Sequence, residues 1–148
     1  MVSDLPWPAE VSNCGVGDAN RYPPMYSEAS KGDRGRLLVV GGGPYHGAPI
    51  LSGMAAARSG CDLVHVAMPE QASSRTKWPP SLIPEVLTDS EFLTPESVRS
   101  LSSFIDSGRP PDAIVIGPGI GREEDSMEAG RKGLSISASK PIPLVNDA

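Results

Sequence analysis

The chain has 148 residues, enough for one domain with a sizeable hydrophobic core. Its 18 acidic and 13 basic residues give a formal net charge of -5, the wrong sign for a general nucleic-acid binder. No run of eighteen apolar residues and no signal-like N-terminus occurs, so neither a membrane span nor secretion is predicted. We therefore expect a cytoplasmic protein whose cysteines, Cys14 and Cys61, are reduced.

The N-terminal segment differs from the rest of the chain. Residues 1–30 combine several prolines with scattered polar residues and have no sustained period, a pattern typical of an arm or linker. Residues 31–148 form the predicted folded domain. Its first strand is predicted at Arg36–Gly41, where the apolar run RLLVVG indicates burial on both faces of a parallel sheet.

A helix and a second strand follow the first glycine turn. Pro49 suits the first turn of a helix, apolar residues then recur at helical spacing, and Gly60 is placed as a C-cap. The run DLVHVAM at Asp62–Met68 predicts the next strand. These elements complete one βαβ unit, which is expected to cross over right-handed.

The middle of the chain carries a weaker pattern followed by a clear one. A short helix is predicted over Glu70–Lys77, then a strand over Leu82–Leu87 that Pro84 weakens. Thr94 as an N-cap with proline behind it opens a helix whose apolar stripe ends at Gly108.

The last third repeats the strand, glycine turn, helix and strand order. A buried strand is predicted at Asp112–Gly117, a helix over residues 122–137 and a strand at Ile142–Asp147. The whole pattern predicts an α/β fold with a doubly wound, mostly parallel sheet and helices on both faces. A parallel strand normally returns through a covering helix, and none precedes the end at Ala148, so a truncated domain is expected.

Two glycine-rich turns are the main candidates for ligand binding. Gly41–Gly47 and Gly117–Gly121 each follow a buried strand and precede a helix, so both are expected at the carboxyl edge of the sheet. Glycine lets amide groups approach an anion, and a helix N-terminus attracts it, which favours a pyrophosphate or nucleotide. Neither turn has dinucleotide-fold or phosphate-loop spacing, and glycines that only form tight turns remain the alternative.

Several polar side chains accompany these turns. Tyr45 and His46 lie within the first one, where their rings can stack on or hydrogen-bond to a ligand, although a solvent-facing histidine is an equal interpretation. His65 is expected to pack in mid-strand. Asp147, at the end of the last strand, fits either a site carboxylate or a turn aspartate.

Three segments resemble successive signatures of the NAD(P)H-hydrate dehydratase family. They are Lys31–Glu70, which contains GGGPYHGAPILSGM, then DAIVIGPGIG at Asp112–Gly121, and PLVNDA at Pro143–Ala148. The resemblance implies a partial ribokinase-like fold, here the N-terminal portion of that family's domain. The run from Gly15 to Pro24 also resembles the linker that joins an upstream hydrate epimerase domain to this one in bifunctional relatives.

The resemblance implies a reaction as well. The family uses ADP or ATP, with Mg²⁺, to convert the S-hydrate of NADH or NADPH back to the dihydronicotinamide. Phosphorylation of the hydrate hydroxyl, followed by elimination of phosphate, is the implied route, because phosphate is a far better leaving group than hydroxide. A small-molecule substrate, no nucleic-acid or membrane partner, and a homo-oligomer at full length are implied.

Site residues follow by position. The family's substrate contacts would fall on Ala48, Gly43, Tyr45 and Gly47 in the first turn and on Gly121, Gly117 and Gly119 in the second. Lys31 and Asp147 would be nucleotide or phosphate contacts. Ser30 and Asn146 depart from the family pattern.

The family's His-Pro-Gly-Glu loop, nucleotide-binding lysine segment and Gly-x-Gly-Asp motif do not occur in the sequence. Because the last of these carries the family's catalytic aspartate, no catalytic residue or metal ligand is assigned, and the fragment is expected to be inactive alone. Two other functions stay open: a related ribokinase-like vitamin or sugar kinase, and a non-catalytic dinucleotide-binding module.

Overall fold

The computed structural model describes residues 28–88, 91–106, 108–138 and 142–147, which form one five-stranded sheet. The strands are β1 (Arg36–Val40), β2 (Leu63–Pro69), β3 (Ile83–Leu87), β4 (Ala113–Ile116) and β5 (Leu144–Asn146). All four pairings are parallel, and the order across the sheet is β3-β2-β1-β4-β5. The helices are α1 (Gly47–Arg58), α2 (Glu70–Ser74), α3 (Pro95–Ile105) and α4 (Glu124–Ala138).

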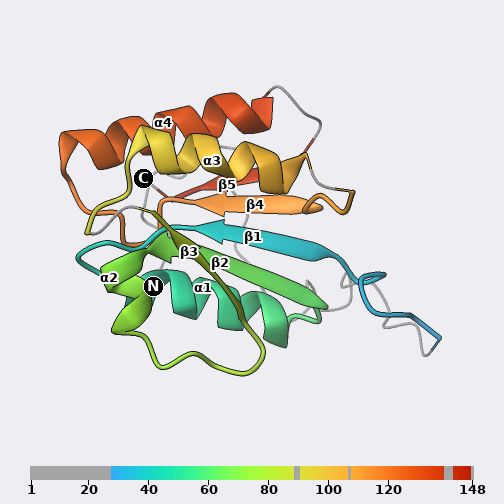
Figure 1. The fold of residues 1–148 in the computed structure, drawn as a ribbon. Coiled ribbons are helices and arrows are strands. Elements are labelled where there is room, and N and C mark those ends of the chain that lie inside the picture. Colours follow the sequence, from blue (N-terminus) through green and yellow to red (C-terminus); the bar gives the residue numbers. More distant parts are fainter. Residues whose placement is uncertain (1–27, 89–90, 107, 139–141, 148) are drawn as a thin grey trace, which may run out of the picture.

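Helices cover both faces of this sheet. Figure 1 shows α1 and α2 on one face and α3 and α4 on the other. The sides follow from right-handed crossovers, because β1 leads to β2 in one direction and β3 crosses back over β1 to β4 in the other. The doubly wound α/β fold predicted from the sequence is confirmed.

Two apolar clusters hold the layers together. Alternate residues of the central strands point to opposite faces, so Leu38 and Val40 pack under α3 and α4 while Val39 packs under α1. All three side chains are almost completely buried. The continuous apolar run in β1 thus reflects a strand covered on both sides. Close packing also fits Gly53 of α1, where a Cβ would lie 3.1 Å from Val66.

The position of β3 at the edge of the described sheet explains why this strand tolerates Pro84. Pro84 lies in a strand that pairs only with β2 in the described chain, so its missing N–H removes no bond from a second neighbour. On the same strand, the Oε1 atom of Glu85 lies 2.8 Å from Nδ1 of His65. The His65 ring also makes an edge contact with Phe104 of α3, 4.9 Å between centroids, which confirms packing as its role.

The predicted boundaries are correct to within a few residues, with two informative differences. Helix α2 ends at Ser74, earlier than predicted, and the edge strand β5 has only 3 residues. The predicted cap of α3 is present, since Thr94 accepts a hydrogen bond from the amide of Ser97. No helix in the described ranges is both long and apolar enough to span a bilayer. The predicted arm, residues 1–30, lies almost entirely outside the described residues.

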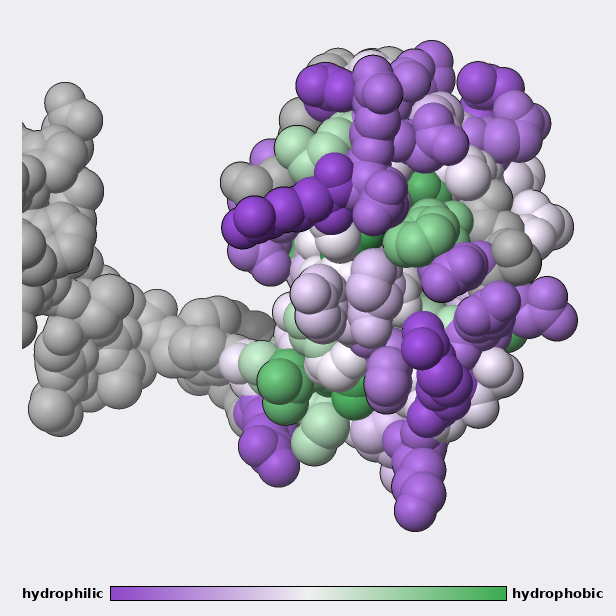
Figure 2. Space-filling view, turned by 90° about the vertical axis from the view of Figure 1, so that its left-hand side faces the viewer, coloured by the Kyte–Doolittle hydropathy of each residue, from purple (hydrophilic) through white to green (hydrophobic). Residues whose placement is uncertain are grey.

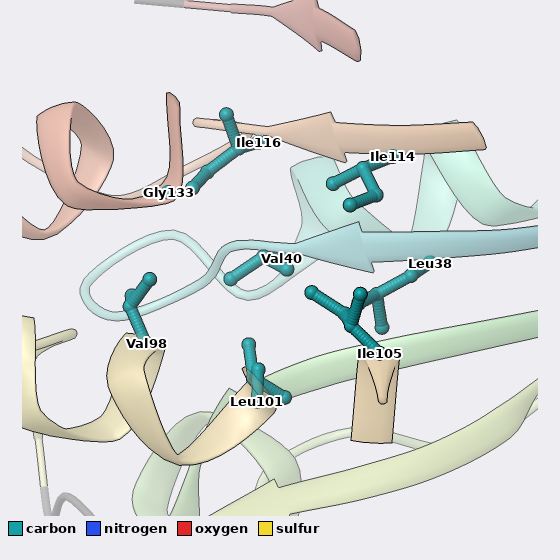
Figure 3. Close-up of a pocket in the computed structure, with 8 residues that line it drawn as sticks. All are labelled: Leu38, Val40, Val98, Leu101, Ile105, Ile114, Ile116 and Gly133. Carbon is teal, nitrogen blue, oxygen red and sulfur yellow. The ribbon is translucent and has the colours of Figure 1, made fainter. Parts of the chain in front are cut away.

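A small apolar cavity lies between the sheet and the helices α3 and α4 (Figure 3). It is lined by Leu38, Val40, Val98, Leu101, Ile105, Ile114, Ile116 and Gly133. Its volume is about 10 Å³, the size of a single water molecule, and its walls offer no polar partner. The cavity is therefore a packing gap beside a helical glycine and is far too small for a nucleotide.

At the amino end of the sheet, two carboxylates hold the backbone that leads into β1. Asp62 accepts hydrogen bonds from the amides of Gly32 and Arg34, at 2.8 and 3.2 Å, and Asp112 accepts one from the amide of Arg36 at 2.8 Å. The bond from Gly32, then that from Arg34, holds the pKa of the Asp62 carboxyl below its usual value. The charged form of Asp62 therefore stabilises the turn before β1.

This linkage predicts a stability difference that depends on pH. A folded-state pKa below the unfolded value of about 3.9 means that the Asp62 carboxylate stabilises above that pH and loses this effect as pH falls through the folded pKa. We expect Asp62→Asn to lower the urea midpoint at neutral pH, and this difference should shrink as the pH falls from about 3.9 through the folded pKa of Asp62. Glu128→Gln, at an exposed position of α4, is the control. If the urea midpoint of Asp62→Asn stays below that of the unsubstituted chain by the same amount at every pH, the prediction is contradicted.

Candidate functional site

Two glycine loops meet at the carboxyl ends of the central strands. The first glycine loop, Gly41–Gly47, follows β1, and the second glycine loop, Gly117–Gly121, follows β4. Strands β1 and β4 are neighbours, and it is between them that the winding of the sheet reverses. The prediction that both glycine loops lie on the carboxyl rim of the sheet is confirmed. In open α/β sheets this switch point is where ligands usually bind.

The two loops pack directly on each other through their backbones. The amide of Gly42 donates to the carbonyl oxygen of Pro118 at 2.8 Å. A Cβ on Gly41 would overlap that same carbonyl, and a Cβ on Gly119 would overlap the carbonyl oxygen of Tyr45. The glycines are therefore required for contact between the loops. No open slot separates them, and a ligand must lie on the outer surface that they form together.

Figure 2 looks onto this rim. Residues of intermediate hydropathy occupy the middle of the face, and strongly hydrophilic residues lie around much of its edge, with smaller hydrophobic areas between them. Tyr45 extends from the first glycine loop with 67% of its surface exposed. An aromatic ring held beside exposed backbone is suited to stacking on a flat ligand ring.

The first glycine loop ends in a helix terminus with free binding capacity. His46 is the N-cap of α1 but its side chain makes no capping hydrogen bond, and the first turn of α1 contains no acidic residue. A Cβ placed on Gly47 would find no atom within 4 Å, so the space beside the first turn is open. Because the first amides of a helix lack internal partners, the amides of Gly47 and Ala48 are the candidate donors to an anion at this rim.

The second glycine loop is followed by a helix start of opposite character. Glu124 and Asp125 lie in the first turn of α4 and are exposed. These charges favour the helix but repel a phosphate placed at the same terminus. The three glycines of the second loop have φ values of 115, 72 and 84° at Gly117, Gly119 and Gly121, so turn geometry requires them. The loops are therefore not equivalent, and only the first suits an anion.

The remaining predicted site residues are divided between the two ends of the sheet. Asp147 lies beside the second glycine loop, where its amide donates to the carbonyl of Ile116 at 2.9 Å and its own carbonyl oxygen closes over Gly117. Lys31 lies in the turn before β1, at the amino end. The structure does not bring Lys31 to the glycine loops, so a phosphate contact there stays a prediction.

Two residues that the sequence did not single out also reach this rim. The Nη2 atom of Arg75, just after α2, donates to the carbonyl oxygen of Gly43 at 2.9 Å. The carbonyl oxygen of Glu91, from the loop before α3, lies 3.6 Å from where a Cβ of Gly43 would be. Both contacts depend on the order β3-β2-β1 on this side of the sheet, a topology that no local motif encodes.

Metal-binding and nucleophilic groups do not gather at this site. Within the described ranges, no group of three or more His, Cys, Asp or Glu residues is placed to hold a metal ion. Cys61 lies at the amino end, where its Sγ donates to the carbonyl of Gly35 at 3.2 Å. Burial raises the pKa of the Cys61 thiol, so it is a poor nucleophile. The groups that the described part of the rim presents are backbone amides and the exposed ring of Tyr45.

Comparison with known proteins adds a family to this geometry. A family model described as NAD(P)H-hydrate dehydratase matches residues 37–148. A bifunctional NAD(P)H-hydrate repair enzyme of Hyperthermus butylicus is 40% identical over 136 residues, which cover 90% of this chain and 25% of that protein. An ADP-dependent (S)-NAD(P)H-hydrate dehydratase of Cenarchaeum symbiosum is 41% identical over 115 residues, covering 76% of this chain and 39% of that protein.

Solved structures agree on the fold. An ADP/ATP-dependent NAD(P)H-hydrate dehydratase from Bacillus subtilis, co-crystallised with ATP and Mg²⁺, superposes with a TM-score of 0.62 at 22% identity, over 85% of this chain and 41% of that one. A ribokinase-like superfamily protein from Enterococcus faecalis superposes with a TM-score of 0.60 at 23% identity, over 82% and 39%. The chain spans only 25% to 40% of the length of the curated relatives that it matches, which are bifunctional repair enzymes and dehydratases.

The loop contacts predict that substitution by alanine is far more destabilising at Gly119 than at Gly47. Gly119→Ala would force a Cβ onto the Tyr45 carbonyl at a φ of 72°, so we expect a loss of several kcal/mol of stability, the cost typical of strain at a special backbone position. Gly47→Ala meets open space at an ordinary φ, and it should change stability by no more than about 1 kcal/mol. Urea unfolding of both variants checks this. Equal stability of the two would contradict the packing of the loops.

Proposed function

Because the chain belongs to the NAD(P)H-hydrate dehydratase family, we propose that its carboxyl rim binds the hydrate of NADH or NADPH for ADP- or ATP-dependent dehydration. One observation carries this proposal. The N-terminus of α1 has no side-chain cap, no acidic residue and open space beside Gly47, at the switch point of the sheet. A dinucleotide supplies a pyrophosphate of matching charge and size.

Each predicted contact has a role in this proposal. The amides of Gly47 and Ala48 bind the pyrophosphate, and Tyr45 packs against a ring of the dinucleotide. Gly43, Gly117, Gly119 and Gly121 are proposed as substrate contacts through their backbone atoms. The missing side chains of Gly117 and Gly119 let the carbonyls of Asp147 and Tyr45 pack against them. In this arrangement the chain orients the substrate, and the backbone donors act on phosphate oxygens without a protonation step.

The phosphoryl donor is the second part of the proposal. We propose ADP or ATP with Mg²⁺, which turns the hydrate hydroxyl into a phosphate that can leave. The Cenarchaeum symbiosum relative is named as ADP-dependent, and the Bacillus subtilis protein was co-crystallised with ATP and Mg²⁺, which supports this donor. The described residues do not offer a cluster for the metal, so none of them is assigned as its ligand. Asp147, exposed beside the second loop, is the carboxylate that we place toward the nucleotide.

Turnover requires groups that this sequence does not contain. The family motifs expected to hold the catalytic aspartate and the nucleotide do not occur between Met1 and Ala148. We therefore propose that this chain binds the dinucleotide and does not turn it over. We also propose that a longer protein with this sequence would be a homo-oligomer. The alternative of a dinucleotide-binding module without catalysis is separated from this proposal by the activity of the longer protein. A vitamin or sugar kinase shares the fold but not the family of the relatives.

Binding of NADPH tests the site directly. Calorimetry of the unsubstituted chain should detect NADPH binding, and Gly47→Ala should weaken it by at least about tenfold, because the added methyl occupies the space in which the phosphates approach the helix amides. Gly108→Ala is the matched control, since a Cβ there also meets no atom within 4 Å but lies on the loop before β4, at the amino end. Equal affinity of Gly47→Ala and Gly108→Ala would exclude the α1 terminus as the phosphate site.

Recovery of the dihydronicotinamide tests the reaction. With S-NADPH hydrate, Mg²⁺ and either ADP or ATP, we expect no rise in dihydronicotinamide absorbance from this chain alone and a rise from a full-length protein that contains it. Full-length protein that leaves the hydrate unchanged with both nucleotides would remove the dehydratase assignment. Turnover by the 148-residue chain would show that the catalytic groups lie within it.

A further inference from the structure

Arg75 connects two elements that the sequence separates. It is the residue after α2, and its guanidinium extends across to the first glycine loop, where Nη2 donates to the carbonyl of Gly43 at 2.9 Å. Its Nε atom donates to the carbonyl of Gln71, one turn earlier, at 3.1 Å. Because one planar group makes both bonds, the end of α2 and the first glycine loop are held at a fixed separation.

The bond to Gly43 acts at the point where the first glycine loop leaves the body of the protein. Gly41 and Gly42 are tied by their own amides to the carbonyls of Ala67 and Pro118. From Gly43 to Gly47, no backbone amide of the described chain donates to another backbone group across the loop. The Gly43 peptide is therefore the last one before α1 that is held by a hydrogen bond to another part of the described chain.

The surroundings of Gly43 leave little room for this peptide to move. Three carbonyl oxygens, from Ile120, Glu91 and Gly119, lie 3.5 to 3.7 Å from the position that a Cβ of Gly43 would take. On its other side the Gly43 carbonyl accepts the hydrogen bond from the Arg75 guanidinium. Because this donor is charged, the hydrogen bond is stronger than one from a neutral group.

We propose that Arg75 is a positioning residue of the dinucleotide site, which holds the first glycine loop so that the amides of Gly47 and Ala48 face the ligand. The proposal rests on the proposed function for the identity of the ligand. Arg75 acts through the Gly43 carbonyl and not through contact with phosphate. Lysine retains the charge but has no planar fork, so it does not reproduce both bonds in this geometry.

The test combines binding with local hydrogen exchange. We expect Arg75→Ala and Arg75→Lys each to weaken NADPH binding by about tenfold, which corresponds to about 1.4 kcal/mol. In both variants, amide exchange should become faster over residues 43–48 in the absence of ligand and stay unchanged in the strands of the sheet. Arg58→Ala removes another exposed arginine, at the far end of α1, and should leave both measurements as they are.

The outcomes separate this proposal from the proposed function. Failure of the unsubstituted chain to bind NADPH rejects the proposed ligand, while the exchange pattern still decides whether Arg75 orders the loop. Full affinity in Arg75→Lys would show that charge alone suffices and would overturn the positioning role. Exchange that accelerates throughout the sheet, or not at all, would overturn it as well, because the first indicates global destabilisation and the second an unaffected loop.

Discussion

The candidate site depends on one constraint, the direct backbone contact between the loops after β1 and β4. Gly42 donates to Pro118 across this contact, and the hydrogen atoms of Gly41 and Gly119 occupy the only space available beside the opposing carbonyls. Such proximity leaves no room for a side chain at the contact itself, where Gly41, Gly42 and Pro118 are buried. The chemistry of the rim around this contact is set by Tyr45 and by the helices that begin at either side of it.

The starts of α1 and α4 make the two sides of the rim electrostatically different. The start of α1 has unpaired amides and no acidic residue, whereas α4 starts with Glu124 and Asp125. An elongated ligand with a charged centre and uncharged rings is thus drawn by its phosphates to one side. The same order of strands that creates the switch point also brings α2 next to the first loop, which is how Arg75 comes to hold Gly43.

Much of this architecture follows from local patterns, and the rest follows from topology. Apolar runs such as Arg36–Val40, the Thr94 cap and the glycine turns predict the elements and their order, because each reflects short-range geometry or burial. Composition cannot reveal where the missing side chain of a glycine permits packing between loops, as it does at Gly119. The role of Arg75 was equally hidden, since its partner lies 32 residues away in sequence.

The pairing of β1 with β4 has a consequence for the order in which the molecule is built. Arg36 and Asp112, which bond to each other at the start of these strands, are separated by 76 residues, so their union closes a long loop of chain. During synthesis β1, α1 and β2 leave the ribosome well before Pro118, and the first glycine loop has no opposing carbonyl until then. The ligand platform is accordingly a late product of folding, completed only when the second half of the sheet docks.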